Sequence, residues 1–190
     1  MIGECIMNAR ASLWAAMDGR PSRSDISHQR VVEALDHSGL VHGWSRPQVD
    51  DLAGLGALRT LVPGVHSDEC LDDASHDGLV ILLDGDVEID ATIEGESFFL
   101  HLQACGDVGR AASFSGGGTL RIRTRLTVRR KSTLLLLQRS RLEGVRALPP
   151  VLMQRLLRNL VLHVHGIARR SYADTEQLRQ YLFGAAVAAT

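Results

Sequence analysis

Aromatic residues are scarce in this sequence: Phe, Trp and Tyr together make up 4% of its 190 residues. Few side chains are therefore available to stack on nucleobases, and we expect no direct DNA binding. The three cysteines are widely spaced without a Cys-x-x-Cys pair, which fits a reducing compartment, so we expect a cytoplasmic protein. No apolar run approaches the roughly 20 residues that span a bilayer, so no membrane span is predicted.

Motifs of catalysis are also lacking. The sequence holds no nucleophile elbow, no P-loop and no paired carboxylates in a catalytic context. Acidic pairs such as Asp72-Asp73 are typical of turns. We therefore predict that the protein is not an enzyme.

Charge of one sign is scarce in each of two long stretches of the chain, although the net charge is only −1. Residues 1–106 hold 6 Lys/Arg against 18 Asp/Glu, and residues 107–170 hold 14 against 2. Such segregation can steer a charged ligand or partner. Acidic and basic strands that lie side by side in one barrel would give the same pattern.

The patterning divides the chain into four parts. Residues 1–25 are expected to form a flexible N-terminal arm, and residues 26–57 two short helices, one over His28–His37 and one that begins near Pro47. Residues 58–147 are expected to form the β region. Residues 148–190 are expected to be C-terminal helices, the first amphipathic after Pro149-Pro150 and a short last one over Thr175–Phe183.

Short runs broken at Gly or Asp fill the β region. Leu79–Leu83 and Phe98–Leu102 are apolar runs, and Arg121–Arg129 alternates between apolar and basic residues. After a charged turn at Arg130–Ser132, the run Leu134–Leu137 is suited to a strand buried on both faces. The sequence therefore predicts an α+β, mainly β fold: an antiparallel β-roll or jelly roll with two short N-terminal helices and C-terminal amphipathic helices.

Several local patterns occur in an order that resembles the cyclic-nucleotide-binding domain family, the sensor part of catabolite-activator-type regulators. Residues 81–89, ILLDGDVEI, resemble its strand–glycine–strand unit, and residues 61–64, LVPG, its turn into the roll. Residues 106–112, GDVGRAA, resemble the start of its phosphate-binding cassette, and we call them the cassette segment. The likeness covers roughly residues 38–170 and implies a β-roll with a nucleotide site.

The cassette segment departs from the family pattern at the ligand contacts. Arg110 stands where the family has an acidic residue that accepts from the ribose, and Arg is a donor with the opposite charge. The family's phosphate arginine falls on Thr119 unless a two-residue shift brings in Arg121. The resemblance therefore implies a degenerate cassette and a protein that does not bind cyclic AMP in the usual way. Any ligand would be held by Gly106, Gly109, Arg110, Ala111, Arg121 and Arg123.

Three hypotheses stay open. The first is a non-enzymatic regulatory and interaction module without a cofactor, which acts through protein partners. In the resembled family the helix after the roll pairs across a twofold axis, which implies a homodimer through a stripe on residues 150–170: Leu156, Leu160, Val164 and Ile167. The second is a sensor that binds a cyclic or other anionic nucleotide through an arginine-rich pocket.

The third hypothesis is a cupin-like metalloprotein, because cupins share the β-roll. Its candidate ligands are His66, His76, Glu88 and His101, which lack the His-x-His pair of those metal sites. The pair His163-x-His165 falls on a predicted helix, where positions two apart point about 200° away from each other. We therefore predict no metal site.

Overall fold

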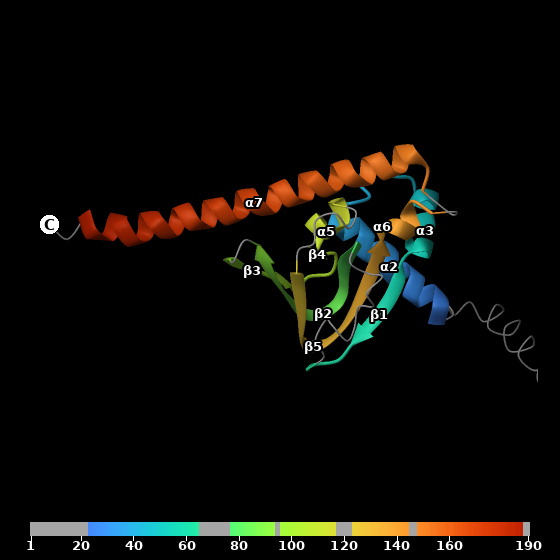
Figure 1. Cartoon of the computed structure of the whole chain (residues 1–190), viewed down its shortest axis with the longest axis horizontal. Helices are drawn as coiled ribbons and strands as arrows, with labels where there is room; N and C mark the ends of the chain where they lie inside the picture. The colour runs from blue at the N-terminus through green and yellow to red at the C-terminus, as the bar shows by residue number, and fades with distance from the viewer. Residues whose placement is uncertain (1–22, 65–76, 94–95, 117–122, 145–147, 188–190) are drawn as a thin grey trace, which may run out of the picture.

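A computed structural model describes residues 23–64, 77–93, 96–116, 123–144 and 148–187. The predicted N-terminal arm, residues 1–25, lies almost entirely outside this part of the chain. One antiparallel sheet forms the body, helices gather at one side of it, and a long C-terminal helix runs past its edge (Figure 1). The predicted α+β, mainly β class is confirmed.

The sheet has the strand order β1-β5-β2-β3, and the short strand β4 pairs with β2. Two strands of 16 residues make its centre, β2 (Gly78–Ile93) and β5 (Arg123–Gln138), antiparallel from Gly78↔Gln138 to Thr92↔Arg123. The outer strands are β1 (Ala57–Leu61) and β3 (Glu96–Leu102), and β4 is Val108–Gly109. All of these pairings are antiparallel, as a β-roll requires.

A bulge bends the long central pair. The register shifts between Leu82 and Val87, where Gly85 adopts a φ of 124° against Ser132. The buried Ser132 hydroxyl accepts from the Asp86 N–H at 3.0 Å and donates to the Arg130 carbonyl at 2.6 Å. The turn predicted at Arg130–Ser132 is therefore wrong: β5 runs through these residues as one strand, because the serine satisfies the backbone groups that the bulge leaves unpaired.

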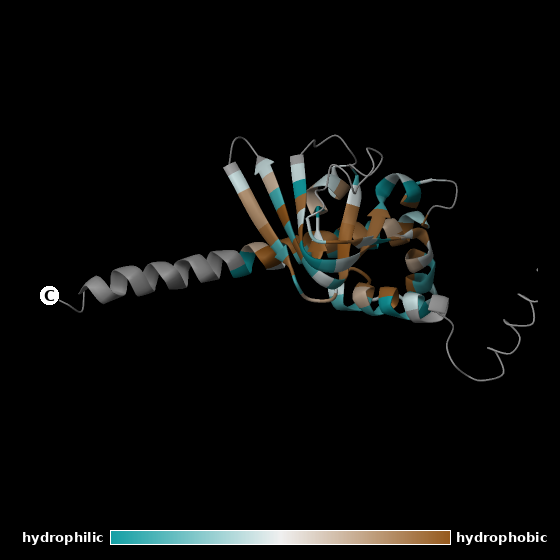
Figure 2. Cartoon of the chain, turned by 90° about the horizontal axis from the view of Figure 1, so that it is seen from below, coloured by the Kyte–Doolittle hydropathy of each residue, from teal (hydrophilic) through white to brown (hydrophobic). Residues whose placement is uncertain are grey.

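Each face of the sheet is covered by its own hydrophobic core. On one face, the helices pack against alternate residues of β2 and β5 together with Val108 and Phe114. On the other face, inside the roll, Val80, Leu82, Val87 and Ile89 meet the opposite alternates of β5 and Leu102. The run Leu134–Leu137 is buried on both faces as predicted. Figure 2 shows hydrophobic residues along the strands and on the helices beside them.

Two helices, α2 (Arg23–Ser38) and α3 (Arg46–Leu55), precede the sheet. The second begins as predicted: Pro47 lies in its first turn, and the Gln48 Oε1 accepts from the Ser45 N–H at 2.9 Å. Short helices α5 (Ala111–Ser115) and α6 (Arg139–Leu142) follow β4 and β5. They hold the chain close to the helical side of the sheet.

The last helix, α7, spans Pro150–Val187 and has 38 residues. The separate helix predicted over Thr175–Phe183 is wrong, because these residues continue α7. Buried Asn159 fixes the first part of α7: its Nδ2 donates to the Leu40 carbonyl at 2.8 Å and to the His42 carbonyl at 3.1 Å. Among the residues described, none of the helices has both the length and the apolar character that crossing a membrane demands.

Candidate functional site

The cassette segment begins in a turn that its own side chains and the central strand hold in place. Gly106 donates to the Leu82 carbonyl at 2.8 Å, and the Asp107 carbonyl accepts from the Leu82 N–H at 2.9 Å. The Asp107 Oδ2 accepts from the N–H groups of Gln103 and Ala104, both at 2.8 Å. The Asp107 carboxylate thus closes the turn and takes up backbone N–H groups that could otherwise face an anion.

Gly106 is required by packing as well as by conformation. Its φ is 91°, in the region that favours glycine. A Cβ at this position would lie 2.6 Å from the His37 Cβ and 2.8 Å from the Ser38 N, at the end of α2. The first glycine of the cassette segment therefore lets the end of α2 approach the turn.

Gly109, the second glycine of the segment, lies against a hydrophobic side chain. A Cβ at this position would come closer than 3.0 Å to the Ile89 Cδ1, and it would lie 3.3 Å from the Leu102 Cδ1. Ile89 and Leu102 are both buried in the core inside the roll. A glycine can admit a ligand or a side chain to close approach, and here it admits Ile89.

Arg110 is buried rather than directed to solvent. It precedes α5 with φ 62° and ψ 27°, a left-handed conformation uncommon for a side chain of its size, and is only 9% exposed. Burial lowers the pKa of its guanidinium, and the charge of Asp77 opposes that shift. The Asp77 Oδ2 accepts from the Ser140 N–H at 2.8 Å, which anchors this carboxylate at the start of α6. Arg110 therefore has a counter-charge within the protein.

Arg139 holds the other end of α5. Its Nη1 donates to the carbonyls of Phe114 and Ser115 at 3.1 and 2.5 Å, and its Nε donates to Glu143 Oε1 at 2.8 Å. Ala111, in the first turn of α5, packs partly buried against the helical core. Sequence reasoning missed both Asp77 and Arg139 because neither lies in a recognisable motif.

For the other two predicted ligand arginines, the structure does not describe the side chains. Arg121 lies outside the described residues, and only the backbone of Arg123 is described. Further along β5, Arg125 and Arg129 are exposed, as their alternation predicts. The Arg129 Nη2 donates to Glu88 Oε2 at 2.7 Å, and the same oxygen contacts the His101 ring. The hydrogen bond from His101 and then that from Arg129 lower the pKa of Glu88.

Of the four predicted metal ligands, the structure describes only Glu88 and His101. His66 and His76 lie outside the described residues, and Glu88 contacts His101 directly. Within the part of the chain that the structure describes, no group of three or more His, Cys, Asp or Glu residues is placed to hold a metal ion. Burial lowers the pKa of His163, and His165 is exposed on a different side of α7.

The predicted dimer stripe on α7 divides into two parts. Leu156 and Leu160 are fully buried in the protein's own helical core, Ile167 is half-buried, and Val164 is 43% exposed. The neighbouring Val161, which is not one of the four predicted dimer residues, is 63% exposed. On the described part of α7, exposed apolar surface therefore includes Val164 of the predicted stripe and the neighbouring Val161.

Comparison with known proteins is informative at the level of structure only. No family model and no curated protein matches the sequence. A cyclic nucleotide-binding domain from Methylobacillus flagellatus is 16% identical, with a TM-score of 0.60 over 80% of this chain and 83% of that chain. The N-terminal domain of a transcriptional regulator from Streptomyces coelicolor is 18% identical, with a TM-score of 0.51 over 70% of this chain and 94% of that one.

A longer chain also matches: the regulatory domain of Toxoplasma gondii PKA with cAMP, at 15% identity and a TM-score of 0.49. The match covers 65% of this chain but only 46% of the Toxoplasma chain, so this protein spans about half of it. The likeness to these structures is a likeness of fold. The chain has the cyclic-nucleotide-binding fold, and the predicted resemblance is confirmed at that level.

Proposed function

We propose that this protein is a non-enzymatic, cytoplasmic regulatory module that acts through protein–protein contacts and forms a homodimer along α7. In this proposal its cyclic-nucleotide-binding-like domain does not bind cyclic AMP in the usual way. One observation carries the proposal. The space beside the Gly109 backbone, which a glycine leaves open for close approach, is filled by the Ile89 side chain. A ligand phosphate that approached the same backbone would have to displace a buried side chain of the roll.

The charge at the cassette segment supports the same conclusion. Arg110 replaces the acidic sugar contact implied by the family resemblance, and it is buried near Asp77 instead of facing a ligand. Losing an acceptor for a buried hydroxyl costs about 1–3 kcal/mol, up to roughly a hundredfold in affinity. The filled space beside Gly109 adds a second, independent penalty.

The proposed dimer is supported by an apolar seam on α7. Leu157, Val161, Val164 and Ala168 are spaced four, three and four residues apart, so they share one side of the helix. Leu157 is half-buried and the other three are exposed. A seam of this spacing is suited to pair with the same seam of a second copy, while Leu156 and Leu160 continue to hold α7 to its own domain.

Calorimetric titration of the full chain with cyclic AMP tests the first part of the proposal. We expect no heat of binding at millimolar ligand, and the same result with cyclic GMP and with cyclic dinucleotides. Micromolar binding of cyclic AMP or GMP would overturn the proposal. Binding of a cyclic dinucleotide alone would favour a sensor of more highly charged nucleotides.

Sedimentation equilibrium tests the second part. We expect a dimer for the wild-type chain and a dissociation constant raised at least about tenfold by the double substitution Val161→Glu and Val164→Glu. Leu58→Glu is the matched control, because Leu58 is an exposed apolar residue on β1, away from α7. A wild-type monomer at all concentrations, or equal effects of the seam and control substitutions, would contradict a dimer along α7.

A further inference from the structure

The helix α5, which continues the cassette segment, is too short to be stable by itself. It has five residues, whereas an isolated helix in water is marginal below about 12–15 residues, because its first turn is costly to form. At the end of α5 the Gly116 N–H donates to the Ala112 carbonyl at 2.9 Å. One or two bonds of this kind do not offset the cost of that first turn. The position of α5 therefore depends on its contacts with other parts of the protein.

Charged side chains lie at both ends of α5. At its C-terminal end, the Arg139 Nη1 donates to the carbonyls of Phe114 and Ser115 at 3.1 and 2.5 Å. The last carbonyls of a helix lack the usual donor one turn further along the chain, so a cation that donates to them stabilises the helix end. At the start of α5, buried Arg110 lies within reach of the charge of Asp77. Each end of α5 is therefore fixed by charges that belong to the protein.

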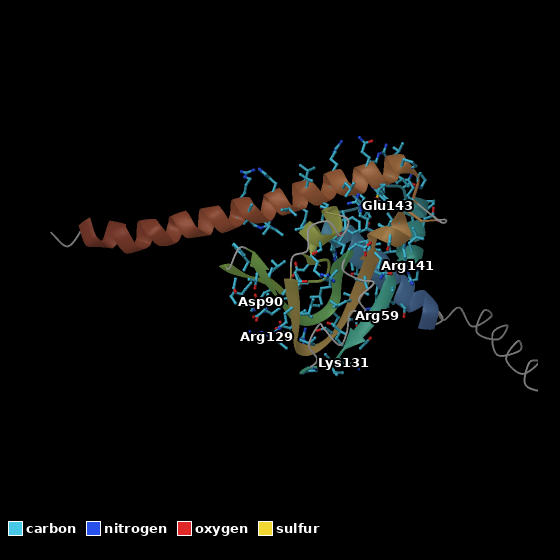
Figure 3. The ribbon with its side chains drawn as sticks, in the orientation of Figure 1. Arg59, Asp90, Arg129, Lys131, Arg141 and Glu143 are labelled. Atoms are coloured by element: carbon cyan, nitrogen blue, oxygen red, sulfur yellow. The ribbon has the colours of Figure 1, made fainter. Side chains whose placement is uncertain are left out.

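Both of these contacts are anchored at α6. Arg139 is the first residue of this helix, and the Asp77 Oδ2 accepts from the N–H of the second, Ser140, at 2.8 Å. Glu143, directly after α6, accepts from the Arg139 Nε at 2.8 Å and so orients the guanidinium. The Arg139 side chain is only 22% exposed, which shields its hydrogen bonds from water. We call Asp77, Arg139 and Glu143 the α5 clamp. Figure 3 shows Glu143 and the nearby Arg141 on the side of the molecule where α7 begins.

The helix α5 in turn supports α7. Phe114 of α5 is fully buried, in the same hydrophobic core as Leu142 of α6 and Leu152 and Leu156 of α7. The two helices α5 and α7 are in contact, and α5 lies beneath α7 in Figure 1. Fixing α5 therefore also fixes part of the surface on which α7 rests. Every group in this series of contacts belongs to the protein itself.

We propose that the α5 clamp holds α5 against α7 without a bound nucleotide, so that α7 always presents the same surface to a second copy. The inference rests on the homodimer proposed above and adds how that contact is regulated: it is constitutive and does not respond to a ligand at the cassette segment. A ligand can only shift an equilibrium between states that it binds differently. A cassette segment held in one position by internal charges offers it no second state to select.

Hydrogen exchange of the full chain, followed by mass spectrometry, tests the clamp. Arg139→Gln removes the guanidinium, and we expect the amides of residues 111–116 to exchange at least about tenfold faster, with those of residues 124–137 unchanged. Arg141→Gln is the matched control, because Arg141 is an exposed arginine on the same helix, and it should leave exchange at residues 111–116 within about twofold of wild type. Equal exchange at residues 111–116 in wild type and Arg139→Gln would overturn the proposal. Exchange that rises equally in the sheet would also overturn it, because it would show a general loss of stability.

Arg139→Lys gives the same comparison if the Gln variant does not fold. Lysine keeps the charge but not the planar fork that reaches two carbonyls and Glu143 at once, so we expect exchange at residues 111–116 to be at least about threefold faster. An unchanged rate in this variant would overturn the clamp.

Sedimentation equilibrium of the same variants tests the link to α7. We expect Arg139→Gln to raise the dimer dissociation constant about threefold or more, and Arg141→Gln to leave it within about twofold. A faster-exchanging α5 with an unchanged dissociation constant would overturn the link. Millimolar cyclic AMP should leave exchange at residues 111–116 of the wild type unchanged, and slower exchange would overturn both the clamp and the proposed function. If Arg139→Gln changes nothing while the dimer persists and nucleotide titration is blank, the clamp alone fails and the proposed function stands.

Discussion

Gly109→Ala tests whether the Ile89 side chain fills the space beside Gly109 in the cassette segment. The added Cβ would lie within 3.0 Å of the Ile89 Cδ1, so Ile89 must shift inside a packed core. Overpacking of this kind costs about 1–3 kcal/mol. Replacing glycine in a strand recovers about 0.5–1 kcal/mol of conformational entropy. We therefore expect Gly109→Ala to lower the free energy of unfolding by about 1–2 kcal/mol.

A double-mutant cycle identifies Ile89 as the cause. Ile89→Val removes the Cδ1 atom, and the closest remaining neighbours of the new Cβ are the Leu102 Cδ1 at 3.3 Å and the Ile89 Cγ1 position at 3.7 Å. Ile89→Val alone is expected to cost about 0.5–1.5 kcal/mol. The double variant should be more stable than the sum of the two losses predicts, by about 1 kcal/mol or more.

Urea unfolding followed by circular dichroism measures all four corners of the cycle. Gly54→Ala is the matched control: Gly54 lies in α3, and a Cβ there would have no neighbour within 4 Å. This control should stabilise the protein by about 0.5–1 kcal/mol. A neutral or stabilising Gly109→Ala, or a cycle that is additive, would refute the argument that Ile89 fills the space beside the glycine.

Three further predictions concern the groups that hold the fold around this site. Asn159→Leu leaves two backbone carbonyls without donors and should lower the free energy of unfolding by about 2–4 kcal/mol; a loss below about 1 kcal/mol contradicts their importance. Asp77→Asn keeps the acceptor for Ser140 but removes the charge near buried Arg110, and should cost about 1–3 kcal/mol in urea unfolding. An unchanged midpoint would show that Arg110 does not depend on that charge. Folding lowers the pKa of Glu88, chiefly through the hydrogen bond from His101. Ionised Glu88 therefore stabilises the fold at pH values above its ordinary pKa of 4.5. This stabilisation is lost as the pH falls through the lower pKa of the folded state. The urea midpoint of Glu88→Gln should therefore lie below wild type near neutral pH and converge with it in acid; a constant difference is the contrary result.

The sheet was predictable wherever alternation and burial agree. Leu79–Leu83, Phe98–Leu102 and Leu134–Leu137 all lie in strands, because short apolar runs between Gly and Asp have few other stable arrangements. The continuity of β5 was not predictable. Charged residues at Arg130–Ser132 are typical of a turn, and only the approach of Gly85, far away in sequence, shows that Ser132 belongs to a bulge.

The candidate site was predictable in position but not in orientation. The family resemblance places Arg110 where an acidic residue is expected, but it does not reveal that the side chain is buried near Asp77, which is 33 positions earlier in the chain. The same limit applies to α7. Its apolar residues make two adjacent stripes, one through Leu156 and one through Leu157, and helical periodicity alone does not say which one packs against the domain.

In our proposal, two separate features keep a cyclic nucleotide from binding at the cassette segment. Reversing one of them leaves the other in place. An acid at position 110 would supply the missing acceptor, but Ile89 would still contact the backbone of Gly109. A smaller residue at position 89 would open space, but Arg110 would still be buried where the sugar contact is expected. Recovery of ordinary cyclic nucleotide binding would require both changes at once. The fold still positions α7, which Asn159 and the helical core hold to the domain, and α7 is the element on which we place the contact with a second copy.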